Sequence, residues 1–186
     1  LAPLPDSAKE ISTIAAALGA GKGSVYLGES ATEAQVKKLD LARYRTLAFA
    51  THGFTAGELR GVIEPALALT PPKAPTEDDD GLLTASEIAR LRLNSDWVIL
   101  SACNTAAPDG TLAAEGLSGL ARAFIFAGSR SLLVSHWPVD SRAAALLTTR
   151  MLQELRKQPG IPKDEALRRA MLALMANKAY GHPLFW

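Results

Sequence analysis

The only cysteine of the chain, Cys103, stands three residues after an apolar run at 97–100. Consecutive apolar residues are typical of a strand that is buried on both faces, as in a parallel sheet covered by helices. Ligands and reacting groups in such sheets gather at the carboxyl ends of the strands. Cys103 therefore stands where this pattern predicts a nucleophile.

A second apolar run, at 46–50, ends just before His52 and Gly53. If the two runs form neighbouring parallel strands, His52 and Cys103, whose numbers differ by 51, emerge at the same edge of the sheet. A histidine within reach of a thiol accepts its proton or stabilises the thiolate, which is the attacking species. We therefore expect the Cys–His dyad of a cysteine peptidase, with the backbone N–H groups of Gly53 and Cys103 as oxyanion donors.

Strands and helices alternate in the pattern of apolar residues, which predicts an α/β fold with a mainly parallel central sheet. Helices are expected at 7–18, from about 30 to 39, at 84–91, from about 113 to 127, at 141–157 and at 163–175, and strands at 24–27, from about 45, at 65–70, at 97–100 and at 130–135. Pro65 at the start of the third strand predicts an edge position, because proline lacks an N–H for the ladder. Thr84 and Glu87 have the spacing of a capping box.

The composition is that of an ordinary globular domain, with 186 residues of which 48% are hydrophobic. A formal net charge of +1 provides no overall field for nucleic acid or an acidic membrane surface, so neither partner is expected. No apolar run reaches the roughly 18 residues needed to cross a bilayer. A single cysteine cannot form an intrachain disulfide, and a cytoplasmic location is expected.

Three further motifs lead us to expect neither a metal nor a cofactor. The segment 21–24 resembles a phosphate loop, but Gly23 occupies the position after the lysine where that loop requires serine or threonine. The acidic segment 77–80 lacks the ligand spacing of a calcium loop and is expected to be solvated. His136 and His182 are too scattered to form a zinc site with Cys103.

Two aspartates have alternative roles. Asp140 is expected to cap a helix that begins at Ser141 or, alternatively, to face a basic side chain of a substrate. Asp109 has the same alternatives.

The chain resembles a CHAT domain, a branch of the caspase-like cysteine peptidases that includes relatives of separase. The matching motifs follow one another through nearly the whole chain, at 49–53, 81–84, 100–105, 115–124, 135–140 and 182–183. The resemblance implies a caspase-haemoglobinase-like three-layer sandwich over residues 1–186, with His52 as general base or ion-pair partner and Cys103 as nucleophile. It also implies that Trp137, together with Ser135, helps to form the substrate cleft. No arginine stands beside Trp137, so the aspartate specificity of caspases is not implied.

The resemblance further implies a domain of bacterial type. It also implies that the chain is a fragment of a longer protein, because family members usually have strands before and after this region. Such domains commonly follow tetratricopeptide-type helical repeats that sense a partner. The implied activity is the cleavage of a protein or peptide through an acyl-thioester intermediate. The alternative is a catalytically inactive interaction module in which Cys103 and His52 are packing residues. A nucleotide-binding switch is a third possibility, which the lack of a phosphate loop disfavours.

Overall fold

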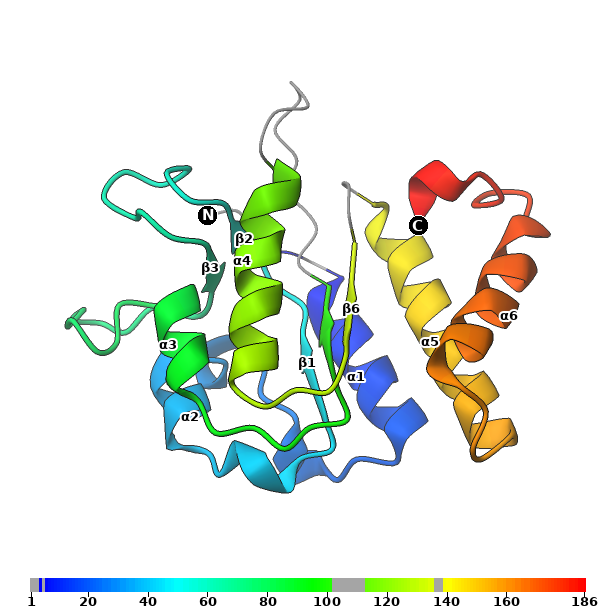
Figure 1. The fold of residues 1–186 in the computed structure, drawn as a ribbon, viewed down its shortest axis with the longest axis horizontal. Coiled ribbons are helices and arrows are strands. Elements are labelled where there is room, and N and C mark those ends of the chain that lie inside the picture. Colours follow the sequence, from blue (N-terminus) through cyan, green and yellow to red (C-terminus); the bar gives the residue numbers. More distant parts are fainter. Residues whose placement is uncertain (1–3, 5, 102–112, 136–138) are drawn as a thin grey trace. The chain divides into compact units, whose positions relative to one another are not determined.

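The computed structural model describes residue 4 and residues 6–101, 113–135 and 139–186 (Figure 1). The side chains of Cys103, Asp109, His136 and Trp137 therefore lie outside the described residues. The chain divides into two compact units, one formed by Leu1–Val25 with Val139–Trp186 and the other by Tyr26–Pro138. Each unit is described by itself below.

A parallel sheet with the strand order β1–β5–β6 forms the centre of the unit Tyr26–Pro138. The strands are β1 (Thr46–Phe49), β5 (Trp97–Leu100) and β6 (Leu132–Val134). All four residues of the middle strand, β5, are buried, as the unbroken apolar run predicts. Parallel strands need long crossover connections, and helices lie in both of them. The α/β fold with a parallel sheet is thus confirmed.

Strands β1 and β5 are direct neighbours, with Thr46 opposite Trp97 and Phe49 opposite Leu100. The indole Nε1 of Trp97 donates to Thr46 Oγ1 at 2.9 Å, which links the two strands at their first residues. Because β1 and β5 run parallel, both end at the same edge of the sheet. The predicted adjacency of the histidine strand and the cysteine strand is confirmed.

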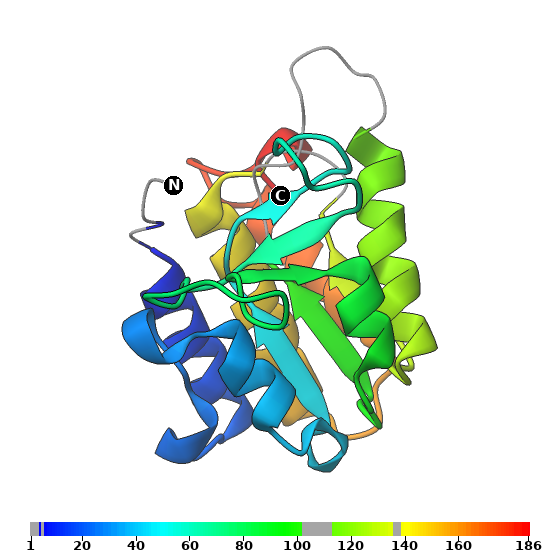
Figure 2. The ribbon, with the colours of Figure 1, turned by 90° about the vertical axis from the view of Figure 1, so that its left-hand side faces the viewer.

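A second, antiparallel sheet has the order β2–β3–β4 (Figure 2). Its strands are β2 (Gly53–Phe54), β3 (Ala66–Ala68) and β4 (Leu82–Thr84), the last of which the sequence pattern did not indicate. The prediction that the strand after Pro65 is an edge strand was wrong, because β3 lies in the middle. Pro65 precedes the strand, so its missing N–H removes no ladder bond, while its carbonyl accepts from Ala85 N at 2.9 Å.

Among its described residues, this unit contains three α-helices, of which the first precedes β1 and the other two lie in the crossovers from β1 to β5 and from β5 to β6. They are α2 (Glu33–Lys38), α3 (Ala85–Arg90) and α4 (Ala113–Phe126), and a short 3₁₀ turn, η3 (Leu41–Arg43), precedes β1. Thr84 and Glu87 form the predicted capping box at α3. On α4, Leu120 and Phe124 are buried, and Phe124 packs against Phe49 with ring centroids 5.6 Å apart. Ile125, which follows Phe124, is 48% exposed, because adjacent residues on a helix point about 100° apart.

The strand predicted at 24–27 is absent: residues 25–27 form neither a helix nor a strand and lie between two 3₁₀ turns, η1 (Lys22–Ser24) and η2 (Gly28–Ser30). Gly28 has a positive φ of 51°, and the Ser30 hydroxyl accepts from Leu27 N at 2.9 Å. A serine that bonds to nearby backbone favours a turn over an extended ladder.

The unit formed by the two ends of the chain contains the helices α1 (Ser7–Leu18), α5 (Ser141–Lys157) and α6 (Lys163–Met175), followed by η4 (Pro183–Phe185). Helix α5 packs against both α1 and α6. Gly19, with a left-handed φ of 68°, ends α1 as predicted. Among the described residues, no helix combines the length and the apolar character that a membrane crossing requires.

Candidate active site

His52 lies three residues after the end of β1, and Cys103 follows the end of β5 by the same number of residues. Phe49 and Leu100, the last residues of the two strands, stand opposite each other. The strands that precede the predicted base and the predicted nucleophile therefore end side by side. Cys103 itself lies outside the described residues, so its proximity to His52 stays a prediction.

The backbone of His52 is attached to the middle strand of the small sheet. The N–H of Ala68 donates to the His52 carbonyl at 2.8 Å, and the Thr51 hydroxyl donates to the Ala68 carbonyl. The imidazole stacks on the ring of Phe54, with centroids 6.5 Å apart and an interplanar angle of 25°. Phe54 is buried, so it provides a fixed wall for one side of the imidazole.

The pairing of β2 with β3 also orients the backbone of Gly53, which stands opposite Leu67. The bond from Ala68 N to the His52 carbonyl makes His52 and Ala68 a hydrogen-bonded position of the ladder. Such positions alternate with non-bonded ones in an antiparallel pair, so the Gly53 N–H points away from β3. A donor in this orientation suits the predicted role of Gly53 in the oxyanion hole, which stays a prediction.

Ser135 directly follows β6, whose last residue, Val134, stands opposite Leu100. Ser135 therefore lies at the same edge of the sheet as the segment of His52, as the predicted cleft requires. Asp140 belongs to the other compact unit, where its Oδ1 accepts from Arg142 N and Ala143 N, each at 2.9 Å. The capping role of Asp140 is thus confirmed, and its contact with a substrate stays a prediction.

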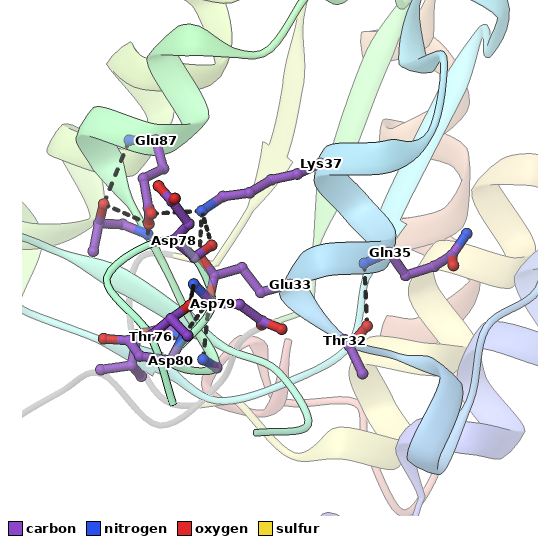
Figure 3. A network of polar contacts seen from close by, with 12 residues as sticks. Thr32, Glu33, Gln35, Lys37, Thr76, Asp78, Asp79, Asp80 and Glu87 are labelled. Carbon is purple, nitrogen blue, oxygen red and sulfur yellow. Dashed lines mark hydrogen bonds and ion pairs between the residues drawn. The ribbon is translucent and has the colours of Figure 1, made fainter. Parts of the chain in front are cut away.

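A buried polar network, which sequence reasoning missed, connects α2, α3 and the acidic segment (Figure 3). The carboxylate of Glu33, with 1% of its side chain exposed, accepts from Lys37 Nζ at 2.5 Å and from the N–H groups of Asp80 and Gly81 at 3.0 and 2.9 Å. Lys37 Nζ also donates to Glu87 Oε1 at 2.7 Å. The network holds the backbone of the acidic segment, although most of its side chains are exposed as predicted.

Burial and hydrogen bonding act in opposite directions on the two carboxylates of this network. Burial raises the pKa of Glu33 above its usual value, although hydrogen bonds from Lys37 and Gly81 counteract it. Burial also acts to raise the pKa of Glu87, but hydrogen bonds from Lys37 and Thr84 outweigh it and lower that pKa. The spacing of Glu33 and Lys37, four residues apart on a helix, was the available sequence signal.

Among the side chains that the structure describes, no group of three or more histidine, cysteine, aspartate or glutamate residues is arranged to hold a metal ion.

The parallel sheet and the residues beyond the ends of its strands define an α/β domain with a candidate site at one sheet edge. The family model of the CHAT domain matches residues 1–186, which include both compact units. The chain therefore belongs to the CHAT domain family, a caspase-like family related to peptidases.

The chain is similar to a much longer repeat protein of mammals. It is 35% identical over 105 residues to tetratricopeptide repeat protein 28 of Mus musculus and 32% identical over 105 residues to that of Homo sapiens. Each match covers 56% of this chain and 4% of the relative's length. Both relatives are tetratricopeptide repeat proteins, in agreement with the expected association with helical repeats. They are mammalian, so the bacterial type stays an expectation.

Proposed function

We propose that this CHAT domain is a cysteine endopeptidase in which His52 activates the thiol of Cys103. The observation that carries the proposal is the register of β1 and β5, in which Phe49 stands opposite Leu100. Two parallel strands in this register end side by side, which supports a dyad formed by residues at equal distances beyond their ends. A dyad needs an imidazole and a sulfur in this relation. The caspase-like three-layer arrangement of the whole domain is part of the proposal.

The proposed reaction divides peptide hydrolysis into two steps. The thiolate of Cys103 attacks the carbonyl carbon of the scissile bond, and the backbone N–H groups of Gly53 and Cys103 stabilise the oxyanion. His52 then donates a proton to the leaving amine, and an acyl-thioester remains on Cys103. Water, deprotonated by His52, attacks the acyl carbon and releases the carboxylic acid and the thiol.

The proposed substrate is an extended segment of a protein that lies along the carboxyl edge of the parallel sheet. Ser135 and Trp137 follow β6 and would line the cleft there, with Asp140 and Asp109 as candidate contacts for basic side chains. Helical repeats in the same protein would regulate access to the site. The proposed setting is the cytoplasm, without nucleic acid or membrane partners.

The second candidate is an inactive interaction module. The relatives are named for their tetratricopeptide repeats, and such repeats form binding surfaces. In this alternative, Cys103 and His52 have only a packing role. The two candidates therefore differ in the reactivity of one thiol.

The rate at which Cys103 is alkylated distinguishes the candidates. We expect iodoacetamide at neutral pH to label Cys103 quickly in the unmodified protein and at least about tenfold more slowly in His52→Ala, because the thiolate loses its partner. Mass spectrometry of the peptide that contains Cys103 gives the rate. His182→Ala is the matched control, since His182 lies in the other unit and accepts from Leu184 N at 3.1 Å. Equally slow labelling in the unmodified protein and His52→Ala contradicts the peptidase proposal.

A further inference from the structure

The backbone around His52 is attached to a single residue of β3, Ala68. The Ala68 N–H donates to the His52 carbonyl at 2.8 Å, and the Ala68 carbonyl accepts from the hydroxyl of Thr51. The second bond comes from a side chain, so it depends on the residue type at position 51.

The position of Ala68 is well restrained, because β3 is the middle strand of its sheet and is paired on both sides. Ala66 and Leu67 have no exposed surface, and Ala68 is 6% exposed. The strand is continued by further backbone bonds, from Leu69 N to the Gly81 carbonyl at 2.8 Å and from Thr70 N to the Ala31 carbonyl at 2.9 Å. A group bonded to Ala68 is therefore fixed to the buried part of the unit.

The imidazole has a second restraint, which acts on the ring. Phe54, buried at 7% exposure, stacks on His52 with an interplanar angle of 25°. This contact limits the tilt of the ring, but it does not restrain the backbone of residues 50–52, which other bonds must hold in place. Thr51 supplies the side-chain bond at this point, between the end of β1 and the beginning of β2.

We propose that Thr51 is a positioning residue for His52: its hydroxyl bond to the Ala68 carbonyl holds the peptide unit before His52 and so keeps the imidazole in the position that the proposed dyad requires. This inference rests on the proposed function of the dyad. Thr51 takes no part in proton transfer. Its effect on the reaction comes from geometry, and a misplacement of about 1 Å can cost about 100-fold in rate.

Valine at position 51 tests the hydroxyl, because it replaces the oxygen by a methyl group of similar size. We expect Thr51→Val to lower the rate of Cys103 alkylation at pH 7 by about tenfold and to shift its pH profile toward that of His52→Ala. In peptide hydrolysis, the same variant lowers kcat by about tenfold and leaves KM within about twofold. Thr51→Ser keeps the donor and restores both rates.

Thr70→Val is the matched control for a purely structural role. The hydroxyl of Thr70 also donates to a backbone carbonyl, that of Gly28 at 2.7 Å, and Thr70 lies two residues after Ala68. This hydroxyl is bonded to Gly28 and not to the His52 segment. We therefore expect Thr70→Val to lower the temperature of thermal unfolding about as much as Thr51→Val does, without changing the pH profile of Cys103 alkylation. A second variant, Thr51→Ala, removes the hydroxyl without adding a methyl group and replaces Thr51→Val if valine prevents folding.

All measurements use the full chain and follow alkylation rate, pH profile and thermal unfolding together. The inference is overturned if Thr51→Val or Thr51→Ala reacts with iodoacetamide as Thr70→Val does, or if Thr51→Ser fails to restore the rate. In either case His52→Ala still reacts slowly, and the dyad stands. If His52→Ala reacts at the unmodified rate, the proposed function itself fails, whatever the variants of Thr51 do.

Discussion

Ser101 donates its backbone N–H to the carbonyl oxygen of Phe49 at 2.8 Å, so the ladder between β1 and β5 continues one residue beyond the end of β5. Cys103 is the second residue after Ser101, and His52 is the third residue after Phe49. The backbone pairing thus extends close to both residues of the proposed dyad. A register shift of one residue would turn the side chains of one strand to the other face, and the bond between Ser101 and Phe49 opposes it.

Replacement of Glu33 by glutamine tests the buried network. Glu33 accepts from Lys37 on one oxygen and from the N–H groups of Asp80 and Gly81 on the other. Whichever way the glutamine amide is placed, its NH₂ group faces donors, so buried hydrogen bonds are lost. We expect the free energy of unfolding to fall by about 2 kcal/mol in urea denaturation.

Glu29→Gln is the control for the loss of a negative charge, because Glu29 is exposed. Its expected effect is below about 0.5 kcal/mol. Equal effects of the two substitutions would show that the buried bonds of Glu33 contribute nothing measurable.

Gly128 is expected to tolerate no side chain. Its φ is +111°, and a Cβ at this position would overlap the carbonyl oxygen of Leu93 and lie 3.1 Å from the carbonyl carbon. Gly128→Ala should therefore lower the free energy of unfolding by about 3 kcal/mol, from backbone strain and steric overlap together.

Gly57→Ala separates the two contributions, because Gly57 has a φ of +80° but no atom within 4 Å of the added Cβ. Only the strain remains there, and we expect a loss of about 1 kcal/mol in the same denaturation experiment. A loss at Gly128 no greater than that at Gly57 would contradict the overlap with Leu93.

Asp140→Ala removes the side-chain cap of α5, in which Oδ1 accepts from Arg142 N and Ala143 N. We expect a loss of about 1 kcal/mol in the free energy of unfolding. Asp6 stands at the corresponding position of α1 but makes no side-chain cap bond, so Asp6→Ala should cost clearly less.

Asp140→Asn distinguishes the cap of α5 from the proposed contact with a substrate. Asparagine retains a cap acceptor and removes the charge, so stability should be nearly unchanged. If Asp140 also binds basic side chains, the preference for lysine and arginine in a peptide-library cleavage profile should weaken in Asp140→Asn. An unchanged profile would exclude Asp140 as a specificity residue and leave the cap in place.

Glu165 on α6 provides the pH prediction. Hydrogen bonds from Arg168 and Arg169 lower the pKa of Glu165 from 4.5 to about 2. Because the pKa is lower in the folded protein, the stabilisation is complete above about pH 4.5 and is lost as the pH falls toward 2. We expect NMR titration of the Glu165 carboxyl to give a midpoint near 2, which moves upward in Arg168→Ala. A midpoint unchanged by that substitution would contradict the role of Arg168.

Local signals predicted the helices of the chain termini most accurately. The expected ranges 141–157 and 163–175 agree with α5 and α6. The cap at Asp140 and the prolines at 159 and 162 act on their immediate neighbours, so no distant part of the chain is needed to place these ends. The capping box of Thr84 and Glu87 is local in the same sense.

Predictions failed where distant residues decide the outcome. The predicted edge position of the strand after Pro65 was wrong, because an earlier segment, β2, pairs with one side of β3 and a later segment, β4, pairs with the other. The buried state of Glu33 depends on the N–H groups of residues 80 and 81, which are nearly fifty positions away. Neither arrangement leaves a periodic pattern in the local sequence.

The sequence by itself determined which residues are able to carry out chemistry, His52 and Cys103, and that the apolar runs before each of them form strands, of which β5 is fully buried and β1 partly buried. Only the tertiary structure decided that β1 and β5 are neighbours in a register that places Phe49 opposite Leu100, and that Thr51 and His52 are bonded to Ala68. The reason is physical: burial follows from the composition of each run, whereas strand pairing depends on which of several apolar runs meet when the core assembles.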